Sequence, residues 1–184
     1  MTRSTATAPT PLATQKSDFT AEGSPPPGMV ANAKPVGSTD AVALLMADHV
    51  EVCLWFAEYD QAGSVADKMA LVAKLCVALS VHVQIEEEIF YPAIEATLED
   101  PMLVPEARLE HMGVKNLIAQ LEGVEPDGVM YDAKVKVLGD CVKHHIKEEQ
   151  VHMFPQVRAT SLDLLELGAR MAARKQALIA LRAS

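Results

Sequence analysis

The sequence predicts an all-α fold: an up-down-up-down antiparallel four-helix bundle with a disordered N-terminal tail and an extra C-terminal helix. Composition is the first reason, because 49% of the residues are hydrophobic but only 4% are aromatic. The apolar residues are mainly Ala, Val, Leu and Met, which favour helices. Spacing is the second reason, because apolar residues recur at alternating steps of three and four along four segments. The connections between these segments are short, so consecutive helices should run antiparallel.

The chain divides into a tail and one folded domain. Its 184 residues suit a single domain with a substantial core. Residues 1–37 differ from the rest, because they hold 6 of the 11 prolines together with many Thr, Ser and Ala. Such a segment buries too little apolar surface to offset its ordering entropy, so we expect a disordered tail. The domain should then cover residues 38–184, with the bundle at 40–157. We expect helices over about residues 40–59, 64–97, 101–123, 129–154 and 161–182.

Local sequence marks several helix ends. The cluster Ser38-Thr39-Asp40 can cap the first helix, and Ser64 with Asp67 three residues later has the pattern of a capping box for the second. Pro92 should bend or shorten the last turn of the second helix, because proline lacks an N–H group and its ring crowds the preceding turn.

Each of the four bundle helices has one apolar face that a single histidine interrupts. These histidines are His49, His82, His111 and His145. A lone histidine on an apolar face is usually a core residue with a hydrogen-bond partner. Four of them, one per face, need another explanation, because burying imidazoles and carboxylates without a ligand costs several kcal/mol per unpaired charge.

Residues 82–92 and residues 145–155 repeat each other. Each stretch begins with a histidine, has a glutamate four residues later, and ends in an aromatic residue and a proline, the proline ten residues after the histidine. Each is preceded by a further histidine, 33 residues upstream in the first copy and 34 in the second. The repeat supplies two matched sets of ligands: His49, His82 and Glu86, and His111, His145 and Glu149.

Four imidazoles and two carboxylates predict a site for two metal ions. Residues i and i+4 project from the same face of a helix, so His82 can bind one metal while Glu86 bridges to the next. The second copy can do the same. Imidazole and carboxylate without thiolate favour two iron ions, with manganese as the second choice, whereas zinc usually takes closed tetrahedral sites. Such a pair leaves a position open on each metal for dioxygen, peroxide or nitric oxide.

The fourth helix offers two other pairings. His144 and Glu148 have the same spacing, but the alignment of the two copies and the apolar face both select His145 and Glu149. We interpret His144 and Glu148 as a solvated surface pair or as outer partners of the ligands. Glu149 with His152 forms the i, i+3 pair of ferritin-like sites, but those sites need the pair twice and it occurs once here.

These residues resemble the hemerythrin family, specifically the bacterial hemerythrin-like (HHE cation-binding) domains. The resemblance covers about residues 40–157 and rests on Asp48-His49, Glu110-His111 and the two His-x-x-x-Glu segments. It implies a four-helix bundle with a non-haem di-iron centre. The ligands that it implies are His49, His82, Glu86, His111, His145 and Glu149.

Two features depart from the oxygen-carrying hemerythrins. Those proteins have two histidines four residues apart on the third helix, but the positions at that spacing from His111 are Ala107 and Lys115. Their fourth helix has His-x-x-x-x-Asp, whereas this chain has His-x-x-x-Glu. Glu110, a tyrosine or solvent could take the place of the missing fifth histidine. A more open and symmetric site suits peroxide decomposition, or sensing of oxygen, nitric oxide or iron, better than oxygen transport.

We therefore expect a non-haem di-iron protein that binds or senses dioxygen or a related small oxidant such as peroxide or nitric oxide. One alternative is a catalase- or peroxidase-like enzyme at the same site, and another is a metal-free helical interaction module. No catalytic triad, phosphate loop or cofactor fingerprint occurs, so no catalytic side chain is assigned.

Charge and composition argue against other classes of protein. The net charge is −9 and no Lys/Arg cluster occurs, so neither nucleic acid nor anionic lipid is an expected partner. We find no uninterrupted apolar run of about 18 residues and no signal-peptide pattern, so we expect a cytoplasmic protein without a membrane span. The three cysteines lack a C-x-x-C motif and suit buried thiols in a reducing compartment. The oligomeric state stays open.

Overall fold

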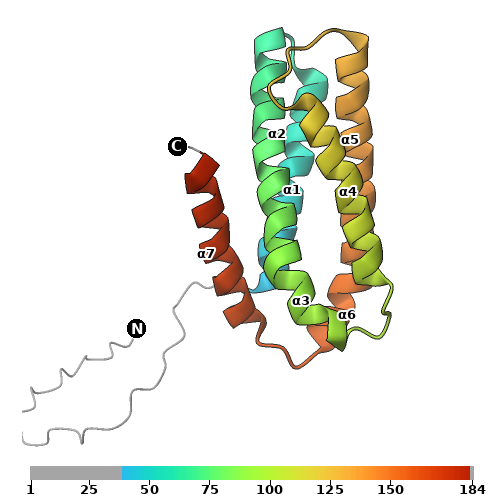
Figure 1. Ribbon diagram of the computed structural model, residues 1–184, viewed down its shortest axis with the longest axis vertical. Helices are drawn as coiled ribbons and strands as arrows, with labels where there is room; N and C mark the ends of the chain where they lie inside the picture. The colour runs from blue at the N-terminus through green and yellow to red at the C-terminus, as the bar shows by residue number, and fades with distance from the viewer. Residues whose placement is uncertain (1–38, 183–184) are drawn as a thin grey trace, which may run out of the picture. The chain divides into compact units, whose positions relative to one another are not determined.

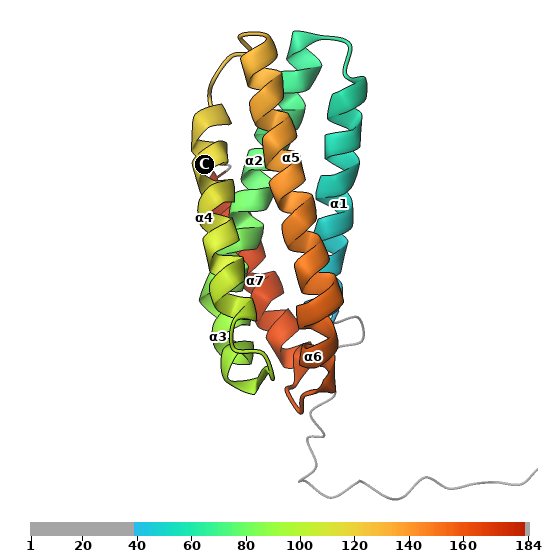
Figure 2. The ribbon, with the colours of Figure 1, turned by 90° about the vertical axis from the view of Figure 1, so that its right-hand side faces the viewer.

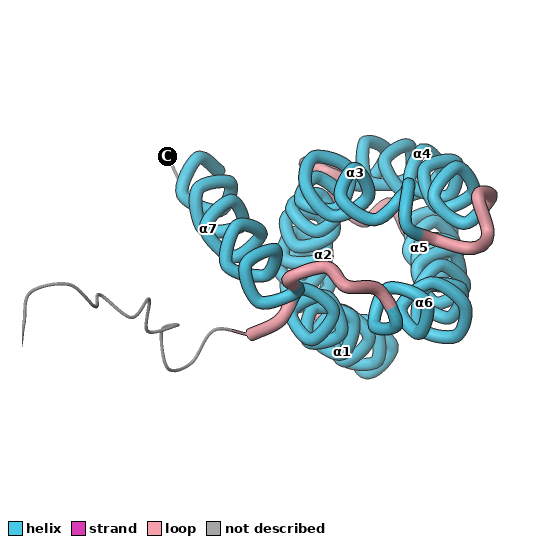
Figure 3. The backbone as a smooth tube through the Cα atoms, turned by 90° about the horizontal axis from the view of Figure 1, so that it is seen from below, coloured by secondary structure: helices cyan, strands magenta, loops and turns pink. Residues whose placement is uncertain are grey.

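Four long helices run alternately up and down in the computed structural model, which describes residues 39–182 (Figure 1). They are α1 (Ala41–Gln61), α2 (Val65–Ile85), α4 (Leu103–Leu121) and α5 (Val129–Glu148). Seen end-on they surround a common centre (Figure 3), and Figure 2 shows α5 between α4 and α1. No strand occurs in the described part of the chain. The predicted all-α four-helix bundle is confirmed, whereas the tail predicted at residues 1–37 lies outside the described residues.

The helices begin at the expected capping residues. The Asp40 side chain accepts a hydrogen bond from the Ala43 N–H group at 2.8 Å, and the Ser64 hydroxyl accepts one from the Asp67 N–H group at 3.1 Å. Such caps satisfy N–H groups that lack a partner within the helix, typically contributing about 1 kcal/mol. Gly128 precedes α5 with a φ of 97°, which residues with a side chain rarely adopt.

Helices α2 and α5 each continue through one wide π-helical turn that begins at a repeat glutamate. These turns are η1 (Glu86–Phe90) and η3 (Glu149–Met153). In each, the backbone N–H group five residues after the glutamate donates to the carbonyl oxygen of the glutamate, so the turn holds one extra residue. The short helices α3 (Tyr91–Ile94) and α6 (Phe154–Ala159) follow, each with the repeat proline in its first turn.

The π turns correct the prediction made at Pro92. Proline cannot donate a hydrogen bond, and its ring meets the carbonyl group four residues back in a regular α-helix. A wider turn directly before the proline accommodates both effects, so the chain stays helical through α3 and η2 (Glu95–Thr97). The same arrangement at Pro155 carries the fourth segment to Ala159, beyond the predicted end at residue 154.

A polar layer divides the core in two. One apolar cluster includes Leu45, Ile85 and Phe90 and lies toward α3 and α6. The other includes Phe56 and Leu75 and lies toward the loops at the opposite end of the bundle. The buried polar and charged side chains of the described residues all belong to the layer between them: Asp48, His49, His82, Glu86, His111, His145 and Glu149.

Helix α7 (Leu164–Arg182) lies outside the ring of four helices and packs on α1 and α2 (Figure 3). It buries Leu167, Met171 and Leu178. Gly168 permits the close approach, because a Cβ atom there would lie 2.3 Å from the carbonyl oxygen of Thr39. The predicted additional helix is therefore present and attached to the bundle.

One segment of the described chain, Val65–Thr97, is long and apolar enough to cross a membrane by length and composition alone. Counting uninterrupted apolar runs did not single it out in the sequence. In its most apolar window 56% of the residues are buried inside the protein, as in the core helices of soluble proteins, which pass the same test. The segment also carries His82 and Glu86 in the polar layer, so its apolar character follows from its place in the core.

Candidate metal centre

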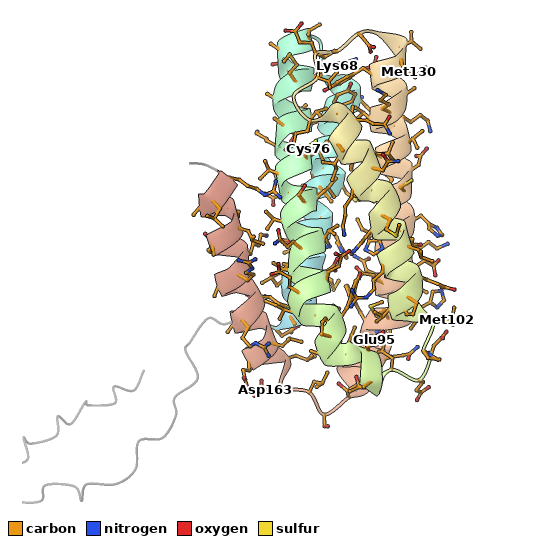
Figure 4. All side chains as sticks on the ribbon, viewed as in Figure 1. Lys68, Cys76, Glu95, Met102, Met130 and Asp163 are labelled. Carbon is orange, nitrogen blue, oxygen red and sulfur yellow. The ribbon has the colours of Figure 1, made fainter. Side chains whose placement is uncertain are left out.

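The structure brings the six residues predicted as ligands into one layer at the centre of the bundle. Each long helix supplies one histidine: His49 from α1, His82 from α2, His111 from α4 and His145 from α5. Glu86 and Glu149 stand at the first positions of the two π turns. None of the six is more than 6% exposed. Figure 4 shows the side chains that fill the bundle interior, with Lys68 and Met130 near one end and Glu95 near the other.

The inward-facing atoms of these residues converge. The Nε2 atoms of His49 and His82 are 3.2 Å apart, and those of His111 and His145 are 3.1 Å apart. Glu86 Oε2 lies 3.3 Å from the Nε2 atoms of both His82 and His111. Each histidine pair therefore belongs to one copy of the repeat, and Glu86 reaches across to both copies.

Glu149, the second carboxylate, also contacts one histidine from each copy of the repeat. Glu149 Oε2 lies 3.3 Å from His49 Nε2 and 3.6 Å from His145 Nε2. Two groups of donor atoms result, each with all its atoms within 4.8 Å of one another: His49, His82, Glu86 and Glu149 in one, and Glu86, His111 and His145 in the other. A carboxylate shared between two groups of ligands is the arrangement that a bridged pair of metal ions requires.

The donor set fits metal cations. Both oxygens of Glu86 and the Oε2 atom of Glu149 are buried and have no hydrogen-bond partner in the described part of the protein. Leaving a buried carboxylate without a partner is strongly unfavourable, whereas a cation in contact with these oxygens would satisfy them. Each facing pair of Nε2 atoms can share one proton in a hydrogen bond, or both atoms can face a cation.

The electrostatics of the layer lead to the same conclusion. Burial by itself raises the pKa of Glu86, but the neighbouring imidazoles of His82 and His111 hold it well below its usual range. Burial by itself lowers the pKa of His82, but the Glu86 carboxylate and the hydrogen bond to Asp48 raise it to about 10. The layer thus demands positive charge at its centre, from protons when no metal is bound.

Polar side chains contact the outward Nδ1 atoms of the four histidines, and we call them outer partners. Asp48 Oδ2 lies 3.4 Å from His82, Glu87 Oε1 lies 3.2 Å from His111, Glu110 Oε2 lies 2.8 Å from His145, and the Gln150 amide lies 3.2 Å from His49. Such contacts fix the tautomer and the orientation of a metal-binding imidazole. All four of these residues are next to one of the six inner histidines and glutamates in the sequence, which is a usable sequence signal. Nothing in the sequence assigns Lys175 to Asp48, a contact made from α7.

The competing residues on the fourth helix face outward. His144 is 64% exposed and its Nε2 atom lies 3.2 Å from Glu110 Oε1, so it contacts an outer partner of His145. His152 and Glu148 form an exposed pair at 3.6 Å. The structure thus places His145 and Glu149 in the interior and leaves the alternative pairings at the surface.

Tyr91 is the tyrosine that lies at the centre. Its hydroxyl donates to Glu149 Oε1 at 3.0 Å and is 3.4 Å from His111 Nε2. Burial, followed by the charges of Glu86 and Glu149, raises the pKa of Tyr91 well above its usual value, so the phenol keeps its proton. Glu110, which the sequence also offered for the missing fifth histidine, is on the outer side of His145. A second tyrosine, Tyr59, lies elsewhere and donates to Asp132 at 2.6 Å.

A small cavity adjoins the histidines on the side away from Tyr91. Its volume is about 20 Å³. Apart from Asp48 and the four histidines, its walls are all apolar: Val52, Leu79, Val83, Val114, Val142 and Ile146. The four imidazoles thus face apolar residues on one side of the site, and the two carboxylates and the Tyr91 phenol on the other.

A helical bundle with a buried cluster of this kind is a metal-binding bundle. The chain belongs to the hemerythrin family, because the family model described as the hemerythrin HHE cation binding domain matches residues 40–157. That match covers both copies of the repeat and ends before α7. The resemblance inferred from the sequence is confirmed.

Known relatives agree with this assignment. The crystal structure of a hemerythrin HHE cation binding domain-containing protein, the Rv2633c homologue from Mycobacterium kansasii, is similar with a TM-score of 0.65 and 27% identity, over 76% of this chain and 87% of that one. The Rv2633c protein of Mycobacterium tuberculosis is 27% identical over 111 residues, which are 59% of this chain and 67% of that protein. A DNA nickase of Nostoc is 24% identical over 111 residues, and the match spans only 31% of its length.

Proposed function

We propose that the chain is a non-haem di-iron protein that binds or senses dioxygen or a related small oxidant. His49 and His82 would hold one iron, His111 and His145 the other, and Glu86 and Glu149 would bridge the two. The contacts of both carboxylates with a histidine from each copy support this assignment. When bound, two irons of this kind supply an exchangeable position and electrons for a small oxidant.

The small cavity that adjoins the histidines is the observation on which the choice of ligand rests. A volume of about 20 Å³ leaves room for one very small molecule and for no organic substrate. Its walls are apolar except at Asp48 and the histidines themselves, so a diatomic molecule loses little on leaving water and entering it. Dioxygen, nitric oxide and peroxide are the redox-active ligands that fit this space.

The protein's own groups would orient and shield that ligand. The apolar walls exclude bulk water from one side of the site. On the opposite side the Tyr91 hydroxyl holds a proton and donates it in a hydrogen bond to Glu149, which fixes the orientation of that carboxylate. The outer partners hold the four imidazoles with Nε2 directed inward.

Tyr91 also gives a specific reason to keep a second candidate function, a catalase- or peroxidase-like reaction. The protonated phenol of Tyr91, which donates to Glu149 at 3.0 Å and lies 3.4 Å from His111, places a group that can hold or move a proton within the site, as peroxide decomposition requires. The third reading, a metal-free interaction module, conflicts with the unpartnered carboxylate oxygens.

Partners and compartment follow from composition. We propose no nucleic-acid partner, because the net charge is −9 and the likeness to the Nostoc nickase spans only 31% of that protein. We also propose a cytoplasmic location, in keeping with three cysteines that are all free.

Metal content tests the first part of the proposal. After anaerobic loading with ferrous iron and removal of the excess, elemental analysis should give two irons per chain. A value of one or less would contradict the two-metal site. Glu86→Ala should lower the value, because it removes a carboxylate that contacts a histidine from each pair.

Filling the cavity tests the second part. Val142→Phe places a ring into the cavity wall, whereas Val137→Phe on the same helix changes a residue that is 49% exposed. With two irons retained in both variants, Val142→Phe should slow the spectral response to dioxygen, nitric oxide and peroxide at least several-fold, and Val137→Phe should not. Equal responses would show that the oxidant does not enter there. Oxygen release from peroxide, compared with free iron, then separates the enzyme from a binding protein.

A further inference from the structure

The two copies of the repeat hold the outer nitrogens of their histidines in nearly the same way. In each copy the residue before the first histidine contacts Nδ1 of the second histidine: Asp48 contacts His82, and Glu110 contacts His145. The residue after each glutamate contacts the first histidine of the other copy. Here the copies differ, because Glu87 contacts His111 whereas Gln150 contacts His49, both at 3.2 Å.

The difference extends one contact further. Lys115, four residues after His111, donates to both carboxylate oxygens of Glu87 at 2.7 Å. The matching position four residues after His49 is Cys53. A charged pair, Glu87 with Lys115, therefore stands outside His111, whereas the matching positions outside His49 hold two neutral residues, Gln150 and Cys53.

An outer partner changes the imidazole as a ligand. A histidine that binds metal through Nε2 keeps its proton on Nδ1 and donates it outward. A carboxylate that accepts this hydrogen bond makes the imidazole a stronger electron donor. The Gln150 atom that faces His49 Nδ1 is the amide nitrogen, which is a donor, so this contact gives His49 no acceptor for that proton. His111 and His145 both have carboxylate partners, at 3.2 Å and 2.8 Å. Of the other pair only His82 has one, at 3.4 Å. A lysine also contacts one carboxylate on each side, Lys115 at Glu87 and Lys175 at Asp48, so the difference between the pairs is the number of carboxylate partners, two against one.

We propose that the two metal positions are inequivalent: the position at His111 and His145 binds its metal more tightly and fills first, and the position at His49 and His82 fills second and exchanges. This inference rests on the proposed two-metal site and adds an order of filling to it.

Loading with less than the full amount of metal tests the order. The metal-free full chain is given one equivalent of Co²⁺, crystallised, and measured by anomalous diffraction at the cobalt edge. Loss of an outer partner typically changes metal affinity about 10–100-fold, so we expect at least roughly tenfold more cobalt at the His111 and His145 position. Equal occupancy, or an excess at His49 and His82, would overturn this inference while leaving the two-metal site intact. Failure to bind any cobalt would overturn both.

Exchanging the outer residues tests the cause. The double variant Gln150→Glu with Cys53→Lys copies the charged pair into the other half without changing the net charge, and should bring the two occupancies to within about threefold. Gln120→Glu, at an exposed position on α4, is the matched control for one added carboxylate and should keep the wild-type ratio.

The reverse exchange uses small changes at the surface of the site. Glu87→Gln with Lys115→Cys should also remove most of the preference, by weakening the tighter position. The helical circular dichroism signal shows that each variant is folded. A wild-type ratio in both folded double variants would show that the outer partners do not set the order, and would overturn the proposal.

Discussion

Adjacent residues on one helix have opposite environments at the centre of this molecule. His145 is 5% exposed and faces Glu149, whereas the His144 side chain is 64% exposed and meets Glu110 at the surface. Successive helical residues differ by about 100° in direction, so this one-residue choice decides which imidazole enters the site. Glu110 lies between the two and contacts both.

A pair of alanine variants tests this choice. His145→Ala should lose metal and lower the melting temperature of the loaded protein, because metal binding is coupled to folding and a ligand is gone. His144→Ala should keep both, since it removes only a surface contact. Metal per chain and thermal unfolding are measured side by side. Loss of metal in His144→Ala with retention in His145→Ala would reverse the register of the fourth helix.

The three thiols should differ in reactivity. Burial, followed by the charge of Glu122, raises the pKa of Cys76 to about 11 from an ordinary 9.0. Only the thiolate reacts with an alkylating reagent, so at pH 8 its reactive fraction is roughly 100-fold below that of an ordinary thiol. Cys53 and Cys141 are only partly buried and should be modified first. Mass spectrometry of the partly alkylated protein checks the order, and similar rates at all three sites in the native protein would contradict it.

The six inner residues could be predicted from the sequence because the pattern that identifies them is local. A histidine and a glutamate four residues apart must share a helix face, whatever the helix packs against. The contacts of Gln150 with His49 and of Lys175 with Asp48 join segments 101 and 127 residues apart. Such contacts depend on how whole helices pack. The place of Gln150 directly after Glu149 is a signal in the sequence, but no pattern assigns Lys175 to Asp48.

Among the elements, the π turns were missed for a related reason. A π turn and an α turn differ by one residue in their hydrogen bonding, and the choice depends on packing. Pro92, which follows the first of these turns, was a signal of irregularity, and we interpreted it as a bend or a shortening of the last turn. In the structure each π turn begins at the glutamate that lies four residues after His82 or His145. Each turn holds one residue more than an α turn.

Helix α7 is the element that lies beyond the family match, and one glycine limits its position. A methyl group at Gly168 would lie 2.3 Å from the Thr39 carbonyl oxygen, so Gly168→Ala must push α7 from the bundle at a cost of about 1–3 kcal/mol. Gly113 on α4 has nothing within 4 Å of the same atom, so Gly113→Ala should stabilise by about 0.5–1 kcal/mol. Thermal unfolding compares the two. An unchanged melting temperature for Gly168→Ala would show that α7 is not held there.

At the scale of the whole molecule, the bundle keeps a charged layer between two apolar clusters. Each cluster stabilises the fold by burying apolar surface, while the layer needs positive charge near Glu86 and Glu149. Metal ions and protons on the histidines are two sources of that charge. The stability of the entire fold should therefore depend on metal and on pH together.

The metal-free protein should lose stability as the pH rises. His82 has a folded-state pKa of about 10, raised by Glu86 and Asp48 against the effect of burial, from an ordinary 6.5. A raised pKa means that the folded state binds the proton more tightly, so this contribution is complete below about pH 6.5 and is lost as the pH approaches 10. Bound metal replaces the proton and removes the dependence. Urea unfolding at pH 6, 7.5 and 9 should show a falling free energy of unfolding for metal-free protein and a nearly constant one for loaded protein. A metal-free protein that gains stability over this range would contradict the account of the layer.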